Sequence, residues 1–293
     1  MSRLRAIVAR FGGVVLDGGA SALIPGPGHS AKDRSVSLRE TEDGRILIHC
    51  FSPRDDWREV RDALVAEGLL EAEPRAKLET RPSRLVALQP VREDKRARAA
   101  RWWREARPIA GTVAERYLRT RGVDDGGGDR AVFRYHASMS SLEDTQRRPA
   151  LLAAIQGNDR ELCGVQVTLL STHGAGKANL ATPRRVIGQL MGGAVRIDQV
   201  ASTLAVGEGV ETMLAARAYL AAPVWALLSA ENLARFDPPE EVETLIIAHD
   251  NDDAGLHALE RLSRRLSPRM AIVPQPPPSS FNDWSDWSDA ARF

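Results

Sequence analysis

The C-terminal third of the chain alternates between apolar runs and helix-like stretches, and this alternation restricts the fold strongly. The apolar runs read LAVGEG, VWALLSA, TLIIAHD and MAIVPQP, and helix-like segments separate them. Strands that alternate with helices predict a parallel sheet with right-handed crossovers. We therefore expect an α/β fold in which residues 201–293 form a parallel four-stranded sheet with flanking helices.

Two of these runs end in carboxylates beside glycine. Glu208 lies in GEGVET (207–212), and Asp250 and Asp252 lie in AHDNDDAG (248–255). The carboxyl ends of parallel strands meet at the edge of the sheet where ligands bind, so the three side chains are expected to converge. Three acidic groups repel one another unless a cation lies among them, and oxygen ligands suit Mg²⁺ or Mn²⁺. The sequence thus predicts a catalytic divalent-metal site for phosphate chemistry. Taken singly, each motif is also typical of helix capping.

Length and composition are those of an ordinary globular protein. The chain has 293 residues, enough for about two domains, and a net charge of +1. Two distant cysteines and no secretory signal argue against a disulfide framework. No apolar run approaches the roughly 18 residues that span a bilayer. We expect a soluble, cytoplasmic protein that does not bind membranes.

Four segments are expected along the chain. Residues 1–70 form a small mixed unit with a hairpin (SVSLR and RILIHCF) and a helix in which Trp57, Val60, Leu64 and Val65 share the apolar spacing. Residues 71–96 are charged, contain proline and form a linker. Residues 97–200 form a basic α+β lobe with mainly antiparallel strands, and residues 201–293 form the parallel-sheet domain.

The pairing of GEGVET with AHDNDDAG resembles the signatures of the Toprim domain, which bacterial-type primases, topoisomerases and certain nucleases share. The resemblance implies that Glu208 acts in acid–base chemistry at the phosphodiester, and that Asp250 and Asp252 bind Mg²⁺. Primases often carry a further acid in a turn after the last strand. Here the turn reads PPPSSFNDW (276–284), and only its Asn-Asp portion matches, which leaves the role of Asp283 open.

The middle of the chain resembles the region that precedes the Toprim domain in phage- and plasmid-type primases. Its stretch GKANLATP (176–183) is similar to the basic segment of primases that guides template and nucleotides. On this resemblance Lys177, Arg184 and Arg185 bind phosphates, although basic runs are also common in solvated loops. GAGKAN is not a P-loop, because Ala178 stands where a serine or threonine would bind Mg²⁺. A helicase motor is therefore not expected here, and a separate replicative helicase is a candidate partner.

The front of the chain resembles the zinc-binding domain of such primases, which reads Cys-Pro-x-His … His-Cys-x-x-x-Cys-Asp. His29 and Cys50 match two ligands, whereas Gly26 and Arg54 stand in the places of two cysteines. A structural zinc site needs four ligands. The resemblance therefore implies a zinc-ribbon-like unit without a full ligand set, and bound zinc is not expected.

Residues 81–107 carry nine arginines and lysines against three acids, with Trp102 and Trp103 among them. The tryptophans are candidates for stacking on unpaired bases, or alternatively for packing against the core and a helix edge. The favoured interpretation is a primase-type nucleotidyltransferase of phage- or plasmid-type replication, with single-stranded DNA and NTPs as partners. The alternatives are a Toprim nuclease that uses the same triad and an accessory nucleic-acid-binding protein of a mobile element.

Overall fold

The computed structural model describes residues 3–30, 33–41, 43–51, 55–71, 94–121, 130–190 and 192–291. It divides into two compact units. The N-terminal unit comprises Met1–Val91 with the short loops Ser140–Arg147 and Leu180–Thr182, and the C-terminal unit comprises the remainder. Most of the predicted linker (71–96) lies outside the described residues. Within the described part of the chain, no helix is both long and apolar enough to cross a membrane.

The N-terminal unit contains an antiparallel sheet in the order β1-β2-β3-β4. Its strands are β1 (Val14–Leu16), β2 (Ser21–Ile24), β3 (Val36–Glu40) and β4 (Ile46–Cys50), and a short 3-10 helix, η1 (Asp17–Gly19), joins the first two. The predicted hairpin corresponds to β3 and β4, which pair antiparallel with Leu38 opposite Ile48.

Helices α1 (Arg3–Phe11) and α2 (Trp57–Ala66) pack on one face of this sheet. The shared core consists of Leu4, Ile7, Ala22, Ile24, Val36, Leu38, Val60 and Leu64. Helix α2 begins where the carboxylate of Asp56 accepts a hydrogen bond from the Arg58 backbone N–H at 2.8 Å. Of the residues that share the apolar spacing of this helix, Val60 and Leu64 are buried in the core, whereas Trp57 is 44% exposed and carries Arg58 over its ring.

The first part of the C-terminal unit contains a second sheet in the order β5-β6-β7-β8-β9. Its strands are β5 (Arg107–Pro108), β6 (Phe133–Ser140), β7 (Arg147–Gln156), β8 (Leu162–Leu169) and β9 (Arg184–Gly188). The pairs β5/β6, β7/β8 and β8/β9 are antiparallel, as the sequence predicted for this region. Helices α3 (Lys95–Glu105) and α4 (Val113–Thr120) and the short 3-10 helix η2 (Arg130–Val132) accompany the sheet.

The second part of the C-terminal unit contains a mixed, mostly parallel sheet in the order β10-β12-β11-β13-β14. Its strands are β10 (Val195–Arg196), β11 (Thr203–Gly207), β12 (Val224–Ala226), β13 (Thr244–Ala248) and β14 (Ala271–Pro274). The four predicted strands are β11 to β14, and they are parallel. The prediction of a purely parallel four-stranded sheet is wrong, because β10 adds a fifth strand antiparallel to β12. With only two residues, β10 is too short to show an alternating pattern.

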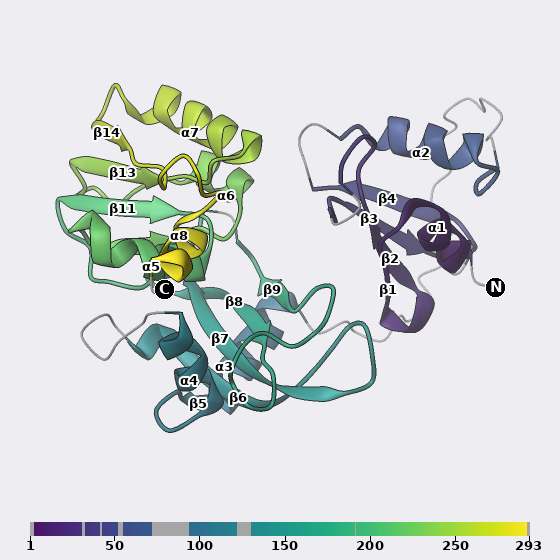
Figure 1. Cartoon of the computed structure of the whole chain (residues 1–293), viewed down its shortest axis with the longest axis horizontal. Coiled ribbons are helices and arrows are strands. Elements are labelled where there is room, and N and C mark those ends of the chain that lie inside the picture. Colours follow the sequence, from purple (N-terminus) through teal and green to yellow (C-terminus); the bar gives the residue numbers. More distant parts are fainter. Residues whose placement is uncertain are drawn as a thin grey trace. The chain divides into compact units, whose positions relative to one another are not determined.

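Helices cover both faces of this mixed sheet (Figure 1). They are α5 (Val210–Leu220), α6 (Ala230–Arg235), α7 (Asp253–Leu266) and α8 (Trp284–Ala290). On one face, Met213 of α5 and Trp284 of α8 share a core with Tyr117 and Ile155 of the antiparallel part. On the other face, α6 and α7 form a core that includes Leu262. The mixed sheet is therefore a middle layer, as in doubly wound α/β folds.

Candidate metal and phosphate site

The predicted acidic residues follow β11 and β13, the two central neighbours of the mixed sheet. These strands pair parallel, with Gly207 opposite Ala248, so they end at the same level. The chain leaves β11 toward β12 on one side and leaves β13 toward β14 on the other side. In open α/β sheets, ligands bind at such a reversal point, beyond the carboxyl ends of the strands. The topology therefore directs Glu208 and the loop of Asp250 and Asp252 to the position where this fold class forms its sites.

Glu208 is half-buried at the end of β11. Its carboxylate accepts a hydrogen bond from the backbone N–H of Ala230, at the start of α6. Burial, with repulsion from Asp252, raises the pKa of Glu208 to about 7. Gly207 before it is required by close packing, because a Cβ at this position would lie 2.6 Å from the carbonyl oxygen of Ala248. The site therefore holds a carboxyl group that exchanges its proton near neutral pH.

Asp250 is the most perturbed carboxyl group of the site. Burial, followed by repulsion from Glu208, Asp283, Asp252 and Asp286, raises its pKa to about 8. Its Oδ1 atom is buried and has no hydrogen-bond partner. A buried acceptor without a donor is costly, and at a functional site it commonly marks the place of a missing ligand.

Asp252 has two roles in the structure. Its Oδ1 accepts a hydrogen bond from the backbone N–H of Gly255 at 2.8 Å, so Asp252 caps α7. Helix capping was the alternative interpretation of this motif. Its charge also acts on Glu208 and on Asp250. Helix capping and participation in the acidic site are therefore compatible for this residue.

The structure adds two acids from the C-terminal segment to the site. The side chain of Asn251 donates a hydrogen bond to the carbonyl oxygen of Phe281 at 2.8 Å, which ties the loop after β13 to the turn before α8. Asp283 caps α8 at Asp286, and both carboxylates act on Asp250. The sequence pointed to Asp283 through the Asn-Asp match. Sequence reasoning did not single out Asp286, which lies one helical turn further on.

The fit of this acidic cluster to a divalent cation rests on the chemistry of its donors. Among the described residues, no three His, Cys, Asp or Glu side chains stand close enough together to hold a metal ion. The Asp250 oxygen without a hydrogen-bond partner, and the burial and carboxylate repulsion that raise the pKa of Asp250 and of Glu208, are features that a cation would relieve. Oxygen donors of this kind suit Mg²⁺ or Mn²⁺, and the binding of such an ion by Glu208, Asp250 and Asp252 stays a prediction.

The predicted phosphate-binding cations form two groups. Lys177 and Arg184 both contact the carboxylate of Glu211, at 3.3 and 3.2 Å. Arg185 instead lies 5.8 Å from the ring centroid of Trp102, which is half-buried on α3. Arg184 and Arg185 are consecutive in β9 and thus project to opposite faces of the strand, which explains why they have different partners.

Trp103 packs against the core and is covered by a cation. It contacts the main cluster of buried residues, and the Arg134 guanidinium lies 4.6 Å from its ring centroid. Arg134 also donates a hydrogen bond to the backbone carbonyl of Trp103 at 2.7 Å. Trp103 therefore has the packing role that the sequence offered as the alternative, and stacking of Trp102 on a base stays a prediction.

The two residual zinc-ligand candidates, His29 and Cys50, both adjoin Asp55 in the N-terminal unit. The imidazole of His29 lies 2.9 Å from Asp33 and 3.3 Å from Asp55. Burial, with the charges of Asp55 and Asp56, raises the pKa of the Cys50 thiol. Since zinc binds the thiolate, this environment opposes ligation by Cys50.

Gly26 stands where the resemblance places a cysteine, and Asp55 fills the space beside it. A Cβ at Gly26 would lie 2.6 Å from both carboxylate oxygens of Asp55. The hydroxyl oxygen of Ser35 lies 2.5 Å from Asp33 Oδ2 and 2.7 Å from Asp55 Oδ2, so its single proton lies between two carboxylates. Arg54, in the place of the other cysteine, lies outside the described residues. A hydrogen-bonded polar cluster thus occupies this corner of the N-terminal unit.

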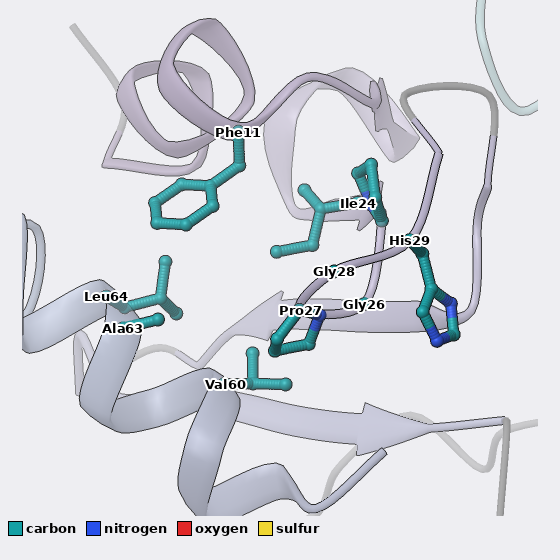
Figure 2. A pocket seen from close by; sticks show the side chains of 10 residues that line it. Phe11, Ile24, Gly26, Pro27, Gly28, His29, Val60, Ala63 and Leu64 are labelled. Carbon is teal, nitrogen blue, oxygen red and sulfur yellow. The ribbon is translucent and has the colours of Figure 1, made fainter. Parts of the chain in front are cut away.

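An apolar cavity of about 290 Å³ borders this polar cluster (Figure 2). Phe11, Val60 and Leu64 point into it from the two helices, and His29 lies at its edge. Among the described residues that line the cavity, His29 is the only one with a side chain that could bind a metal ion. This part of the unit therefore depends on apolar packing.

We predict that the purified protein contains far less than one zinc ion per chain. The reason is that His29 is engaged by two carboxylates, that burial and nearby carboxylates raise the pKa of the Cys50 thiol, and that Gly26 offers no ligand. Elemental analysis after dialysis against a mild chelator measures the content. One tightly held zinc per chain would contradict the prediction. The zinc-ribbon ancestry of this unit stays a prediction.

Comparison with known families identifies the C-terminal part of the chain. Residues 203–292 match the family model described as "Toprim domain". Residues 93–197 match the model described as "Domain of unknown function (DUF7146)". The protein is therefore a Toprim-domain protein, as the GEGVET and AHDNDDAG motifs predicted. No curated protein sequence matches the chain.

Several solved structures of primases are similar to this chain at low identity. A DNA primase domain from Pseudomonas aeruginosa has 13% identity and a TM-score of 0.44, over 67% of this chain and 74% of that chain. The zinc-binding and RNA polymerase domains of the Aquifex aeolicus primase have 12% identity and a TM-score of 0.47, over 100% and 82%. The primase fragment of the bacteriophage T7 primase-helicase protein has 14% identity and a TM-score of 0.41, over 62% and 68%. No activity of this chain follows from similarities of this size.

Proposed function

We propose that this protein is a primase-type nucleotidyltransferase, which joins ribonucleotides into short oligonucleotides on single-stranded DNA in phage- or plasmid-type replication. The observation that carries the proposal is the acidic cluster of the Toprim domain. Glu208 and Asp250 follow neighbouring parallel strands, and the pKa of each is raised first by burial and then by charges of the same cluster. Primer synthesis needs such a cluster, because phosphate charge has to be neutralised while a hydroxyl attacks.

The residues of the cluster divide this work among them. A Mg²⁺ or Mn²⁺ ion held by Asp250 and Asp252 would neutralise charge on the phosphate oxygens. Glu208, with a pKa of about 7, is suited to accept the proton of the attacking hydroxyl near neutral pH. Lys177 and Arg184, partly exposed beside the same helix start, offer positive charge to the nucleotide phosphates.

In this proposal, the basic helix α3 binds the single-stranded DNA template. This helix contains Lys95, Arg96, Arg98, Arg101 and Arg104 with a single acid, Glu105, and it presents Trp102 beside Arg185. Arginines that follow one helix bind a sugar-phosphate backbone, and an aromatic ring among them stacks on a base. A separate replicative helicase is the corresponding candidate protein partner.

The test is a template-directed synthesis reaction with the full chain. Protein, single-stranded DNA, labelled NTPs and Mn²⁺ are incubated and the products are separated by length. We expect short labelled oligonucleotides that require both template and NTPs. Absence of any product across templates of varied sequence would reject the proposal. Cleavage of the DNA without NTPs would instead assign the Toprim nuclease activity, and metal-independent DNA binding without turnover would assign an accessory role.

A further inference from the structure

Glu211 is a buried acid that the proposed chemistry does not use. It lies in the first turn of α5, one helical turn after Glu208, and its side chain is only 7% exposed. A buried carboxylate is expensive unless charged and hydrogen-bonding groups compensate it. The side chain of Glu211 therefore requires partners. Besides its own backbone N–H, these partners come from outside α5.

Both carboxylate oxygens of Glu211 are engaged. The hydroxyl of the fully buried Tyr117 donates a hydrogen bond to Oε1 at 2.7 Å. Lys177 Nζ lies 3.3 Å from Oε1, and Arg184 Nη1 lies 3.2 Å from Oε2. Burial alone would raise the pKa of Glu211, but Arg184, Lys177 and the Tyr117 hydroxyl together lower it to about 2. The group is thus a permanent anion that binds two cations at once.

The two cations have long, partly exposed side chains. Lys177 lies in the segment between β8 and β9, where it forms an isolated bridge with Leu170, and Arg184 is the first residue of β9. Their side chains are 26% and 45% exposed, so a ligand in solvent can reach them. Two cations and one carboxylate leave a net charge of +1 at the first turn of α5, three residues along the chain from Glu208. Without Glu211, these long side chains would have to be immobilised by each ligand that binds.

We propose that Glu211 is a positioning residue, which holds Lys177 and Arg184 in a fixed pair beside the Toprim carboxylates so that they receive the phosphates of the incoming nucleotide. This inference rests on the proposed nucleotidyltransferase function and deepens it. The hydroxyl of Tyr117 fixes the orientation of the Glu211 carboxylate. Its loss should therefore also raise KM for NTP, but by less than the loss of the Glu211 charge.

The central test compares Glu211→Gln with the wild type in the synthesis reaction. The variant keeps the shape of the side chain and removes its charge. We expect KM for NTP to rise at least about tenfold and kcat to change less than about threefold, because phosphate binding away from the reacting atoms is mainly uniform binding. An unchanged KM would overturn the inference.

A double-mutant comparison separates positioning from general stability. If Glu211 acts through the two cations, Glu211→Gln should have no further effect on KM in a Lys177→Met/Arg184→Met background. Fully additive effects on KM would show an independent structural role and overturn the inference. Should Glu211→Gln fail to fold, Tyr117→Phe takes its place, with a rise in KM of about threefold expected from the lost hydrogen bond and no change contradicting the proposal.

Asp237→Asn is the matched control. Asp237 is also a carboxylate held by two cations, Arg265 at 3.3 Å and Arg269 at 2.6 Å, but Arg265 lies in the last turn of α7 and Arg269 follows that helix. The 14-residue helix α7 places them about 18 Å from its first turn, where the acidic cluster lies. The control is therefore expected to leave KM unchanged.

Equilibrium binding of ATP with Mn²⁺ keeps this inference distinct from the proposed function. If the wild type makes no oligonucleotides but binds ATP about tenfold more tightly than Glu211→Gln does, the proposed function fails and the positioning role stands. If the wild type synthesises oligonucleotides and both proteins bind ATP equally, the function stands and the positioning role fails.

Discussion

Replacement of Asp250 by asparagine is expected to lower oligonucleotide synthesis by at least about 10³-fold. Asparagine keeps the size of the side chain but cannot supply the charged oxygen that a divalent cation needs. Charge stabilisation by such a cation is worth several kcal/mol in the transition state, and each 1.36 kcal/mol corresponds to a factor of about ten in rate. The measurement is the initial rate of labelled oligonucleotide formation at saturating Mn²⁺. Activity within about tenfold of the wild type would remove Asp250 from the proposed site.

The same substitution is expected to stabilise the metal-free fold at alkaline pH. The pKa of Asp250 is raised from its ordinary 3.8 to about 8, so the folded state holds a proton that the unfolded state has released between these values. The wild-type protein therefore loses stability as pH rises from about 4 to about 8. The asparagine side chain of the variant would carry no such cost, which predicts a gain on the order of 1–3 kcal/mol at pH 8 and a smaller gain at pH 5. Thermal unfolding without metal measures both values.

Asp253→Asn is the matched control for Asp250→Asn. Asp253 belongs to the same acidic string, but it is exposed in the first turn of α7. We expect its activity to stay within about threefold of the wild type and its unfolding temperature to change little, as is usual for exposed positions. Equal losses of activity in Asp253→Asn and Asp250→Asn would mean that the acids of AHDNDDAG act only through their total charge.

The mixed sheet was largely readable from the sequence, because apolar strand-like runs and helical stretches alternate there without interruption. The same reasoning missed α1, although Leu4, Ile7, Val8 and Phe11 follow the i, i+3, i+4, i+7 spacing of an amphipathic helix. The apolar spacing also did not show how deeply each residue of α2 is buried. Periodicity shows which residues share a face of a helix, but Trp57 is the first helical residue and lies at the margin of the contact with the sheet.

For the candidate site, the sequence indicated the acids but not their surroundings. Glu208 and Asp250 are recognisable because each follows an apolar strand closely. The hydrogen bond from Tyr117 to Glu211 joins residues 94 positions apart, and no local pattern indicates it. Likewise, the opposite directions of Arg184 and Arg185 follow only once both are known to lie in a strand. Long-range pairing depends on the packing of two different sheets, which local propensity does not encode.

Metal affinity is expected to fall steeply as pH is lowered, by about 10² between pH 8 and pH 6. In the metal-free protein the pKa of Glu208 is about 7 and that of Asp250 is about 8, so acidification places protons on the groups that a cation needs in ionised form. Each proton that the ion displaces changes the apparent affinity about tenfold per pH unit below the pKa. The two carboxyl groups interact, so the protons belong to the pair and not to either residue alone.

Calorimetric titration with Mn²⁺ at pH 6, 7 and 8, in buffers of different ionisation enthalpy, measures both this affinity and the number of protons released. Glu208→Gln should reduce the pH dependence, because it removes one of the two titrating groups, whereas Asp253→Asn should retain it. A Mn²⁺ affinity that stays constant from pH 6 to pH 8 would show that the ion binds outside this pair of carboxylates.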